Sequence, residues 1–180
     1  MTDLTAMQAD LRRAYLGGGV GAIVSGLVWL VAALVAQQAG LRTGYLALFI
    51  GGMLIYPVST LFERHVLRVP AEAKGNPGGP LVMETLPAML GGLLFAFLLI
   101  DLRPDWVFAV AAFVVGAHYF PFRTAYGDRT YWVLGGVVAA LGAGTIWAGL
   151  PPAGMLPWLV AAVEIMGGVF LIAKTRREFA

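Results

Sequence analysis

Six long apolar segments alternate with short polar or Gly/Pro-rich breaks along this chain. The apolar segments cover residues 16–36, 44–62, 81–100, 106–122, 131–150 and 156–173. Each is close to the roughly 20 residues that a helix needs to cross the hydrocarbon core of a bilayer. The pattern predicts an all-α bundle of about six transmembrane helices. Because little sequence remains between the segments, residues 1–180 are expected to form a single integral membrane domain.

The stretch before the first apolar segment has a different pattern. Leu4, Met7 and Leu11 recur at helical spacing, with acidic and basic residues between them. This spacing predicts a short cytoplasmic or interfacial helix within residues 1–14. A frayed polar tail is the alternative.

The placement of the basic residues gives the orientation. Only 12% of the residues are charged, and just two of the twelve Lys and Arg residues, Arg42 and Arg103, fall in breaks on one side. The other ten fall in the breaks and ends on the opposite side: Arg12, Arg13, Arg64, Arg68, Lys74, Arg123, Arg129, Lys174, Arg176 and Arg177. Because positively charged loops resist translocation, both termini are predicted to be cytoplasmic. The expected location is a bacterial inner membrane, with the lipid bilayer as the principal partner.

Composition also argues against several kinds of chemistry. The chain has no cysteine and two histidines, so a thiolate nucleophile, a disulfide or a His/Cys metal site is not expected. No nucleophile with an adjacent base can be recognised, and the net charge of +2 gives no reason to expect nucleic-acid binding. We therefore expect no enzyme activity, no cofactor and no metal.

Glu164 lies near the middle of the last apolar segment. An uncompensated carboxylate at that depth costs on the order of 3 kcal/mol, so Glu164 is predicted to face protein. Ala161 and Gly168 lie on the same helical face and allow close packing, with Ser25 or Thr145 as a possible hydrogen-bond donor. Glu164 is then either a neutral packing residue or a proton or cation site.

A second candidate polar site lies nearer the cytoplasmic ends of the helices. Glu84 and His118 are at similar predicted depths in the third and fourth segments, and Arg123 is a rival partner for Glu84. A carboxylate–imidazole pair is one hypothesis. The alternative is an interfacial glutamate that reaches water and a histidine bonded to the backbone.

Three prolines fall in the cytoplasmic halves of these segments: Pro57, Pro87 and Pro121. Proline frees a carbonyl group and can bend a helix, so the three bends could outline a cavity. Prolines placed merely near helix ends are the alternative.

Small residues at every fourth position predict where helices pack closely. Two such series occur, one in the first segment and one in the fifth: Gly18, Ala22, Gly26 and Gly136, Ala140, Gly144. The same stripes are compatible with a homo-oligomer.

Several longer runs carry a resemblance to a known family: LRRAYLGGGVGAIVSGLVW at 11–29, GGMLIYPVSTL at 51–61, GNPGGPLVMET at 75–85 and FRTAYGDRTYWVLG at 122–135. The chain resembles a bacterial membrane-protein family labelled only as a domain of unknown function. The resemblance implies a small multi-span inner-membrane protein and brings no activity or catalytic residue with it.

Three classes of function remain, of which a membrane-embedded enzyme ranks last because no nucleophile with an adjacent base and no metal-ligand cluster can be recognised. The mid-membrane glutamate and the proline-bearing segments favour a carrier or channel for a small solute or ion. The small-residue stripes are typical of a non-catalytic membrane protein that acts through self-association or a partner protein.

Overall fold

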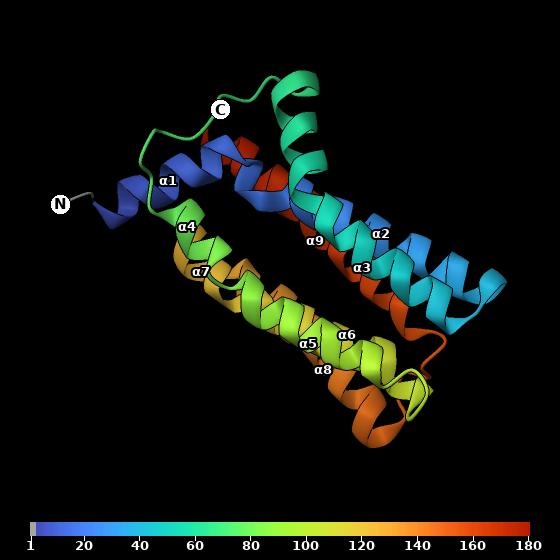
Figure 1. Cartoon of the computed structure of the whole chain (residues 1–180). Coiled ribbons are helices and arrows are strands. Elements are labelled where there is room, and N and C mark those ends of the chain that lie inside the picture. The colour runs from blue at the N-terminus through green and yellow to red at the C-terminus, as the bar shows by residue number, and fades with distance from the viewer. Residues whose placement is uncertain (1–2) are drawn as a thin grey trace.

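The computed structural model describes residues 3–180, and helices are the only regular secondary structure in this part of the chain (Figure 1). Six helical stretches are long and apolar enough to cross a membrane: Leu16–Ala39, Leu41–Val66, Gly78–Leu98, Pro104–Tyr126, Thr130–Ala148 and Leu156–Glu178. The predicted all-α bundle of six spans is therefore confirmed. The main difference is at the boundaries, because the second, fourth and sixth helices continue about four or five residues beyond their apolar cores.

Some spans consist of more than one helix. The α-helices are α1 (Leu4–Ala14), α2 (Gly19–Ala39), α3 (Leu41–Leu61), α4 (Gly78–Met83), α5 (Leu86–Leu98), α6 (Val107–His118), α7 (Phe120–Tyr126), α8 (Thr130–Ala148) and α9 (Leu156–Glu178). Shorter turns are η1 (Leu16–Gly18), η2 (Phe62–Val66) and η3 (Pro104–Trp106). The third span is α4 followed by α5, and the fourth is η3, α6 and α7.

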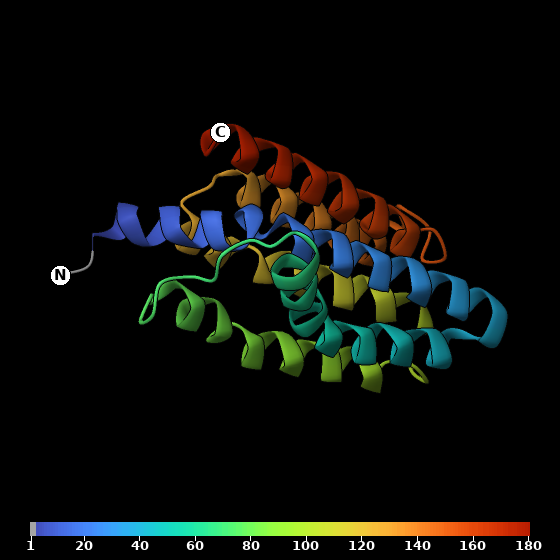
Figure 2. The same ribbon diagram turned by 90° about the horizontal axis from the view of Figure 1, so that it is seen from above.

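The long helices form two layers that run alongside each other (Figures 1 and 2). In one layer α2 packs between α9 and α3, and in the other α6 packs between α8 and α5. Contacts of α9 with α8 and α6 join the layers along one edge. At the opposite edge the Tyr45 hydroxyl of α3 donates a hydrogen bond to the Leu93 carbonyl of α5 at 2.5 Å.

The chain termini lie at one end of the bundle, and the α2–α3, α5–α6 and α8–α9 connections lie at the other (Figure 1). The ten basic residues that the sequence assigns to one side therefore gather at the end that holds both termini. Arg42 lies at the other end, where it forms an ion pair with Asp101 at 2.9 Å.

Glycines allow α2 and α9 to approach closely. A Cβ atom added to Gly26 would lie 2.8 Å from the Ala161 carbonyl oxygen, and one added to Gly168 would lie 2.5 Å from the carbonyl oxygen of Gly19. Ala22, on the same helix, is buried. Ala22 and Gly26 of the stripe predicted in the first span thus lie on a packing face. Gly18 does not, because it precedes α2 with φ +76°, and Gly19 instead makes the close contact with Gly168 of α9.

The stripe predicted in the fifth span does not face a neighbouring helix. No atom lies near a Cβ added to Gly136, and Ala140 is exposed. Gly144 lies beside the carbonyl group of Leu150 in the following turn. The α8 face that packs on α6 instead carries Gly135 and Gly142, so the prediction was one or two residues away from the true packing face. A four-residue spacing cannot distinguish these faces in a helix that contains so many glycines.

The predicted N-terminal helix is present as α1 from Leu4 to Ala14. The carboxyl group of Asp10 joins it to the loop before α4 by accepting hydrogen bonds from the Ala73 backbone N–H and the Asn76 side chain, both at 2.8 Å. Arg13 pairs with the other carboxyl oxygen of Asp10 at 2.6 Å. Met1 and Thr2 lie outside the described residues.

This attachment is expected to weaken in acid. Burial raises the pKa of Asp10, but the hydrogen bonds from Ala73, Asn76 and Arg13 outweigh it, so the pKa is lowered below its ordinary value. A carboxyl group of this kind stabilises the fold above its unfolded pKa of about 3.9, and the contribution is lost as pH falls through the lower, folded pKa. We expect protection of the Ala73 amide against hydrogen exchange to fall roughly tenfold between about pH 6 and pH 3. Asp10→Asn should remove this pH dependence, and an unchanged profile in that variant would contradict the assignment.

Candidate functional site

Glu164 lies completely buried in α9 between the two layers, as the sequence predicts for a carboxyl group in the middle of a span. Its Oε1 accepts a hydrogen bond from the Tyr119 hydroxyl at 3.0 Å. Its Oε2 has no hydrogen-bond partner among the described residues. Ser25 of α2 adjoins both Glu164 and Tyr119. Within residues 3–180 no Lys or Arg forms an ion pair with Glu164, so this part of the chain supplies weak donors and no neutralising charge.

Ser25 and Thr145 were the alternative donors for Glu164, and the fold separates them. Ser25 lies one turn from Ala22 on the α2 face that packs against α9, so it reaches the carboxyl group. The Thr145 hydroxyl instead donates to the Pro151 carbonyl at 2.7 Å, at the far end of α8. Ser25 is therefore the residue that belongs to this site.

Tyr119 reaches Glu164 from a break in the fourth span. Helix α6 ends at His118 and α7 begins at Phe120, with Pro121 in its first turn. Pro121 has no N–H to continue the helical hydrogen-bond pattern, which accounts for the break at this point. Discontinuous helices expose backbone polar groups within a membrane and are frequent where transporters bind their substrates.

The third span is broken at the same level. Helix α4 ends at Met83 and α5 begins at Leu86, with Pro87 in its first turn. The Thr85 hydroxyl and His118 Nδ1 lie 2.7 Å apart and join the two breaks. The Thr85 hydroxyl also lies 2.7 Å from the Val82 carbonyl oxygen, and the tautomer of His118 sets which group donates in the contact between Thr85 and His118.

The predicted pairing of Glu84 with His118 or Arg123 is wrong. Glu84 is exposed, and its carboxyl group takes part in none of the ion pairs or side-chain hydrogen bonds of residues 3–180. The short break between α4 and α5 turns Thr85, not Glu84, toward His118. Glu84 and His118 have similar depths along their helices, but Glu84 lies on a side of its helix that does not face His118. The guanidinium group of Arg123 lies over the ring of Trp132, 5.2 Å from its centre.

The contact between Thr85 and His118 gives a stability prediction. Thr85→Val keeps the shape of the side chain but leaves the half-buried imidazole without its partner, so we expect a loss of about 1 kcal/mol. In a double-mutant cycle with His118→Ala, thermal unfolding should show coupling between the two substitutions. Glu84→Gln is the matched control and should be additive with His118→Ala. Coupling to Glu84 instead of Thr85 would overturn the observed geometry.

A crevice of about 540 Å³ opens at the end of the bundle away from the termini. It lies between α2, α9 and the start of α6, and its lining includes Ala33, Phe108 and Pro157. One turn deeper along α2, the buried Trp29 packs against Phe108 with ring centres 6.1 Å apart. Ser25 follows one further turn along the same face. A single aromatic layer therefore separates the crevice from the Glu164 site.

Tightly packed aromatic rings occupy the other side of Glu164, where three proline bends were expected to outline a cavity. Tyr119 and Tyr131 have ring centres 6.1 Å apart, and Tyr131 and Tyr126 have ring centres 5.3 Å apart. The Tyr131 hydroxyl donates to the Gly17 carbonyl at 2.6 Å. The breaks at Pro87 and Pro121 are real, but the side chains around them fill the space.

The sequence analysis did not identify a second buried carboxyl group. Glu63 lies in the π-helical turn η2 after Pro57 of α3, where Figure 1 shows the chain bending away from the rest of that helix. Its side chain is 1% exposed, and Oε2 has no hydrogen-bond partner among residues 3–180. Its carboxyl group lies near the hydroxyls of Tyr126 and Tyr131. The predicted second span stopped at residue 62, which placed Glu63 in a polar loop.

Arg64 follows Glu63 in the chain but does not neutralise it. One guanidinium nitrogen of Arg64 donates to the carbonyl groups of Ala14, Val69 and Pro70 at 2.7, 3.2 and 3.3 Å. The guanidinium group also lies over the ring of Tyr15. Glu63 and Glu164 thus share the same condition: each is a buried carboxyl group with a free oxygen, beside tyrosine hydroxyls and without an ion-pair partner in the described residues.

The pattern of the family of unknown function DUF7010 matches residues 4–174, nearly the whole chain. The protein belongs to this family. No curated protein and no solved structure matches it. Membership confirms the resemblance to a family known only as a domain of unknown function. A functional assignment for this DUF7010 protein must therefore come from its own residues.

Proposed function

We propose that this DUF7010 protein is a proton-coupled carrier for a small solute or ion in a bacterial cytoplasmic membrane. The observation that carries the proposal is the fully buried Glu164, which has one free carboxyl oxygen and no cationic partner. A carboxylate in the bilayer interior is costly, so natural membrane proteins keep such groups chiefly where they serve a pathway. Binding and release of a proton is the chemistry that these donors and this burial allow.

A carrier fits the geometry better than an open channel. Phe108 lines the crevice of about 540 Å³ and packs against the buried Trp29. The rings of Tyr119, Tyr126 and Tyr131 pack on the other side of Glu164. Access from either end therefore requires movement of one layer relative to the other. The breaks at Tyr119 and Thr85 provide points where α7 and α4 can change direction.

The inner half of the proposed proton route leads from Glu164 toward Glu63. The Tyr119 hydroxyl contacts Glu164, and Tyr131 and Tyr126 continue the aromatic stack toward the carboxyl group of Glu63. A tyrosine hydroxyl both donates and accepts hydrogen bonds, so we place the proposed transfer on the hydroxyl groups of these residues, with the Tyr131 hydroxyl leaving the Gly17 carbonyl when it takes part. Helix η2 is a π-helical turn, a distortion that occurs frequently at functional sites.

The proposal is tested in proteoliposomes that contain a pH-sensitive dye. Solutes and ions are added one at a time from a panel of cations, anions, amino acids, sugars and amphipathic amines. A carrier of this kind should acidify or alkalinise the lumen when its substrate is added, and an imposed pH gradient should drive substrate uptake. Movement of a solute without any proton movement would contradict the coupling. Complete inactivity together with a stoichiometric co-purifying protein would favour the partner-binding alternative.

The orientation is part of the proposal and has its own test. The ten-to-two distribution of Lys and Arg favours cytoplasmic termini, and the chain has no native cysteine to interfere with labelling. Single cysteines are placed at exposed positions in both sets of loops. An impermeant thiol reagent should label cells carrying cysteine at Gln38, Leu102 or Gly154, and should not label Lys74, Arg129 or Arg177 variants until the membrane is opened. The reverse pattern would invert the proposed orientation.

A further inference from the structure

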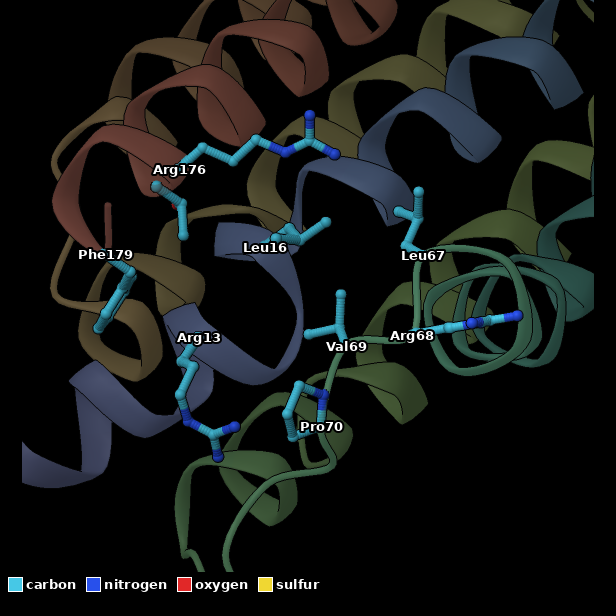
Figure 3. Close-up of a pocket in the computed structure, with 9 residues that line it drawn as sticks. Arg13, Leu16, Leu67, Arg68, Val69, Pro70, Arg176 and Phe179 are labelled. Atoms are coloured by element: carbon cyan, nitrogen blue, oxygen red, sulfur yellow. The ribbon is translucent and has the colours of Figure 1, made fainter.

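A separate pocket of about 330 Å³ lies at the end of the bundle that carries the chain termini. Figure 3 shows its lining, which comes from three segments: the end of α1 with η1, the loop after η2, and the end of α9. Leu16 and Val69 lie between the side chains of Arg13, Arg68 and Arg176. The pocket thus has an apolar floor and three arginines in its lining, whose guanidinium groups point in different directions (Figure 3).

The positive charge of these arginines is largely uncompensated. Arg68 and Arg176 are exposed, and neither forms an ion pair within residues 3–180. Arg13 forms an ion pair with Asp10. Two basic groups outside the pocket are paired: Arg12 with Glu178 at 2.7 Å and Lys174 with Asp128 at 2.7 Å. Within the described part of the chain, Arg68 and Arg176 therefore bring two unpaired positive charges to the pocket.

The position of the pocket relative to the spans indicates what it can hold. Leu16 is the first residue of the first span, and Arg176 lies in the last turns of the sixth. These residues are at the level where a bilayer changes from acyl chains to headgroups. Guanidinium groups bind phosphate oxygens through paired N–H donors, and the leucine and valine floor suits the glycerol and upper acyl carbons of a lipid.

We propose that this pocket binds the phosphate group of an anionic ligand, supplied in the membrane by the headgroup of an anionic phospholipid. In this proposal the exposed side chains of Arg68 and Arg176 turn toward the phosphate, Arg13 stays paired with Asp10 at the edge of the pocket, and Leu16 with Val69 contacts the apolar part of the lipid. The inference is independent of the transport proposal, since it uses neither Glu164 nor the crevice.

The test compares lipid binding by two double variants of the full chain. Arg68→Gln/Arg176→Gln removes two charges from the pocket lining, and Arg129→Gln/Arg177→Gln removes two exposed charges from the same end without altering the pocket. The purified proteins are titrated in neutral detergent with phosphatidylglycerol, phosphatidylcholine or inorganic phosphate, and bound species are counted by native mass spectrometry. The pocket double variant should bind phosphatidylglycerol on the order of thirtyfold more weakly than the wild type, and the control should bind it nearly as well.

The remaining outcomes are also decisive. The wild type could bind inorganic phosphate tightly, show no preference for phosphatidylglycerol, and lose phosphate binding in the pocket double variant. That result would keep the phosphate site and assign it to a free anion. Equal weakening in both double variants would overturn the pocket and leave a diffuse surface charge. Equal affinity of the wild type for phosphatidylcholine and phosphatidylglycerol, with no binding of phosphate, would also overturn it.

Discussion

Replacing Glu164 with Gln should abolish proton-coupled transport, with a fall in flux of at least about a hundredfold, and leave the protein folded. Gln has nearly the same shape and still accepts a hydrogen bond from Tyr119, so the packing between the layers is kept. It cannot bind and release a proton in the working pH range, so coupling is lost. Flux in proteoliposomes and thermal unfolding in detergent are measured on the same preparation.

Two further variants separate function from packing. Glu84→Gln removes an exposed carboxyl group at the other break and should leave flux unchanged. Glu164→Leu places an apolar side chain of similar volume against Tyr119 and Ser25, whose hydroxyls then lose a partner. If Glu164→Leu is more stable than the wild type and fully active, Glu164 is neither a proton site nor a necessary polar contact, and the proposal fails.

Gly168→Val should strongly destabilise the protein. A Cβ atom at Gly168 would lie 2.5 Å from the Gly19 carbonyl oxygen and 2.9 Å from the Ile23 backbone nitrogen. Because backbone atoms cannot move aside as a flexible side chain can, α2 and α9 must separate. We expect a loss of about 3 kcal/mol, which corresponds to a decrease in Tm of about 6 to 12 °C.

Gly136→Val is the matched control for this substitution. Gly136 is also a helical glycine in an apolar span, but no atom lies within reach of an added Cβ. The same change of residue should therefore alter Tm by no more than a few degrees. Equal destabilisation by both substitutions would show that helix flexibility, not the close approach of α2 and α9, sets the need for glycine.

The features that could be predicted from the sequence are those with a strong one-dimensional signal. The spans follow from segments of about 20 apolar residues, and the common end of the termini follows from an even number of spans. The burial of Glu164 follows from the cost of placing a carboxylate against lipid. Each of these inferences depends on how far a residue lies along its helix, which the chain order gives directly.

The features that were missed depend on the rotation of a helix about its axis. The prediction placed the α8 packing face at Gly136, whereas the structure has it at Gly135. It also offered Glu84 as the partner of His118, whereas the adjacent Thr85 makes that contact. One residue corresponds to a rotation of about 100° in an α-helix, and the breaks at Pro87 and Pro121 reset that rotation. Glu63 was missed because a π-helical turn extends the second span beyond its apolar core.

The central claim, that Glu164 gains and loses a proton, is tested most directly by infrared difference spectroscopy of the protein in lipid. Spectra are recorded as the pH is stepped from acid to alkaline, and the Glu164 signal is the protonated-carboxyl carbonyl band that disappears in Glu164→Gln. Our account predicts that this band loses intensity reversibly as pH rises and that Tyr119→Phe shifts its frequency, because the Tyr119 hydroxyl donates to Glu164. A Glu164 band that keeps its full intensity at every pH at which the protein stays folded would identify a permanently neutral packing residue and contradict the account.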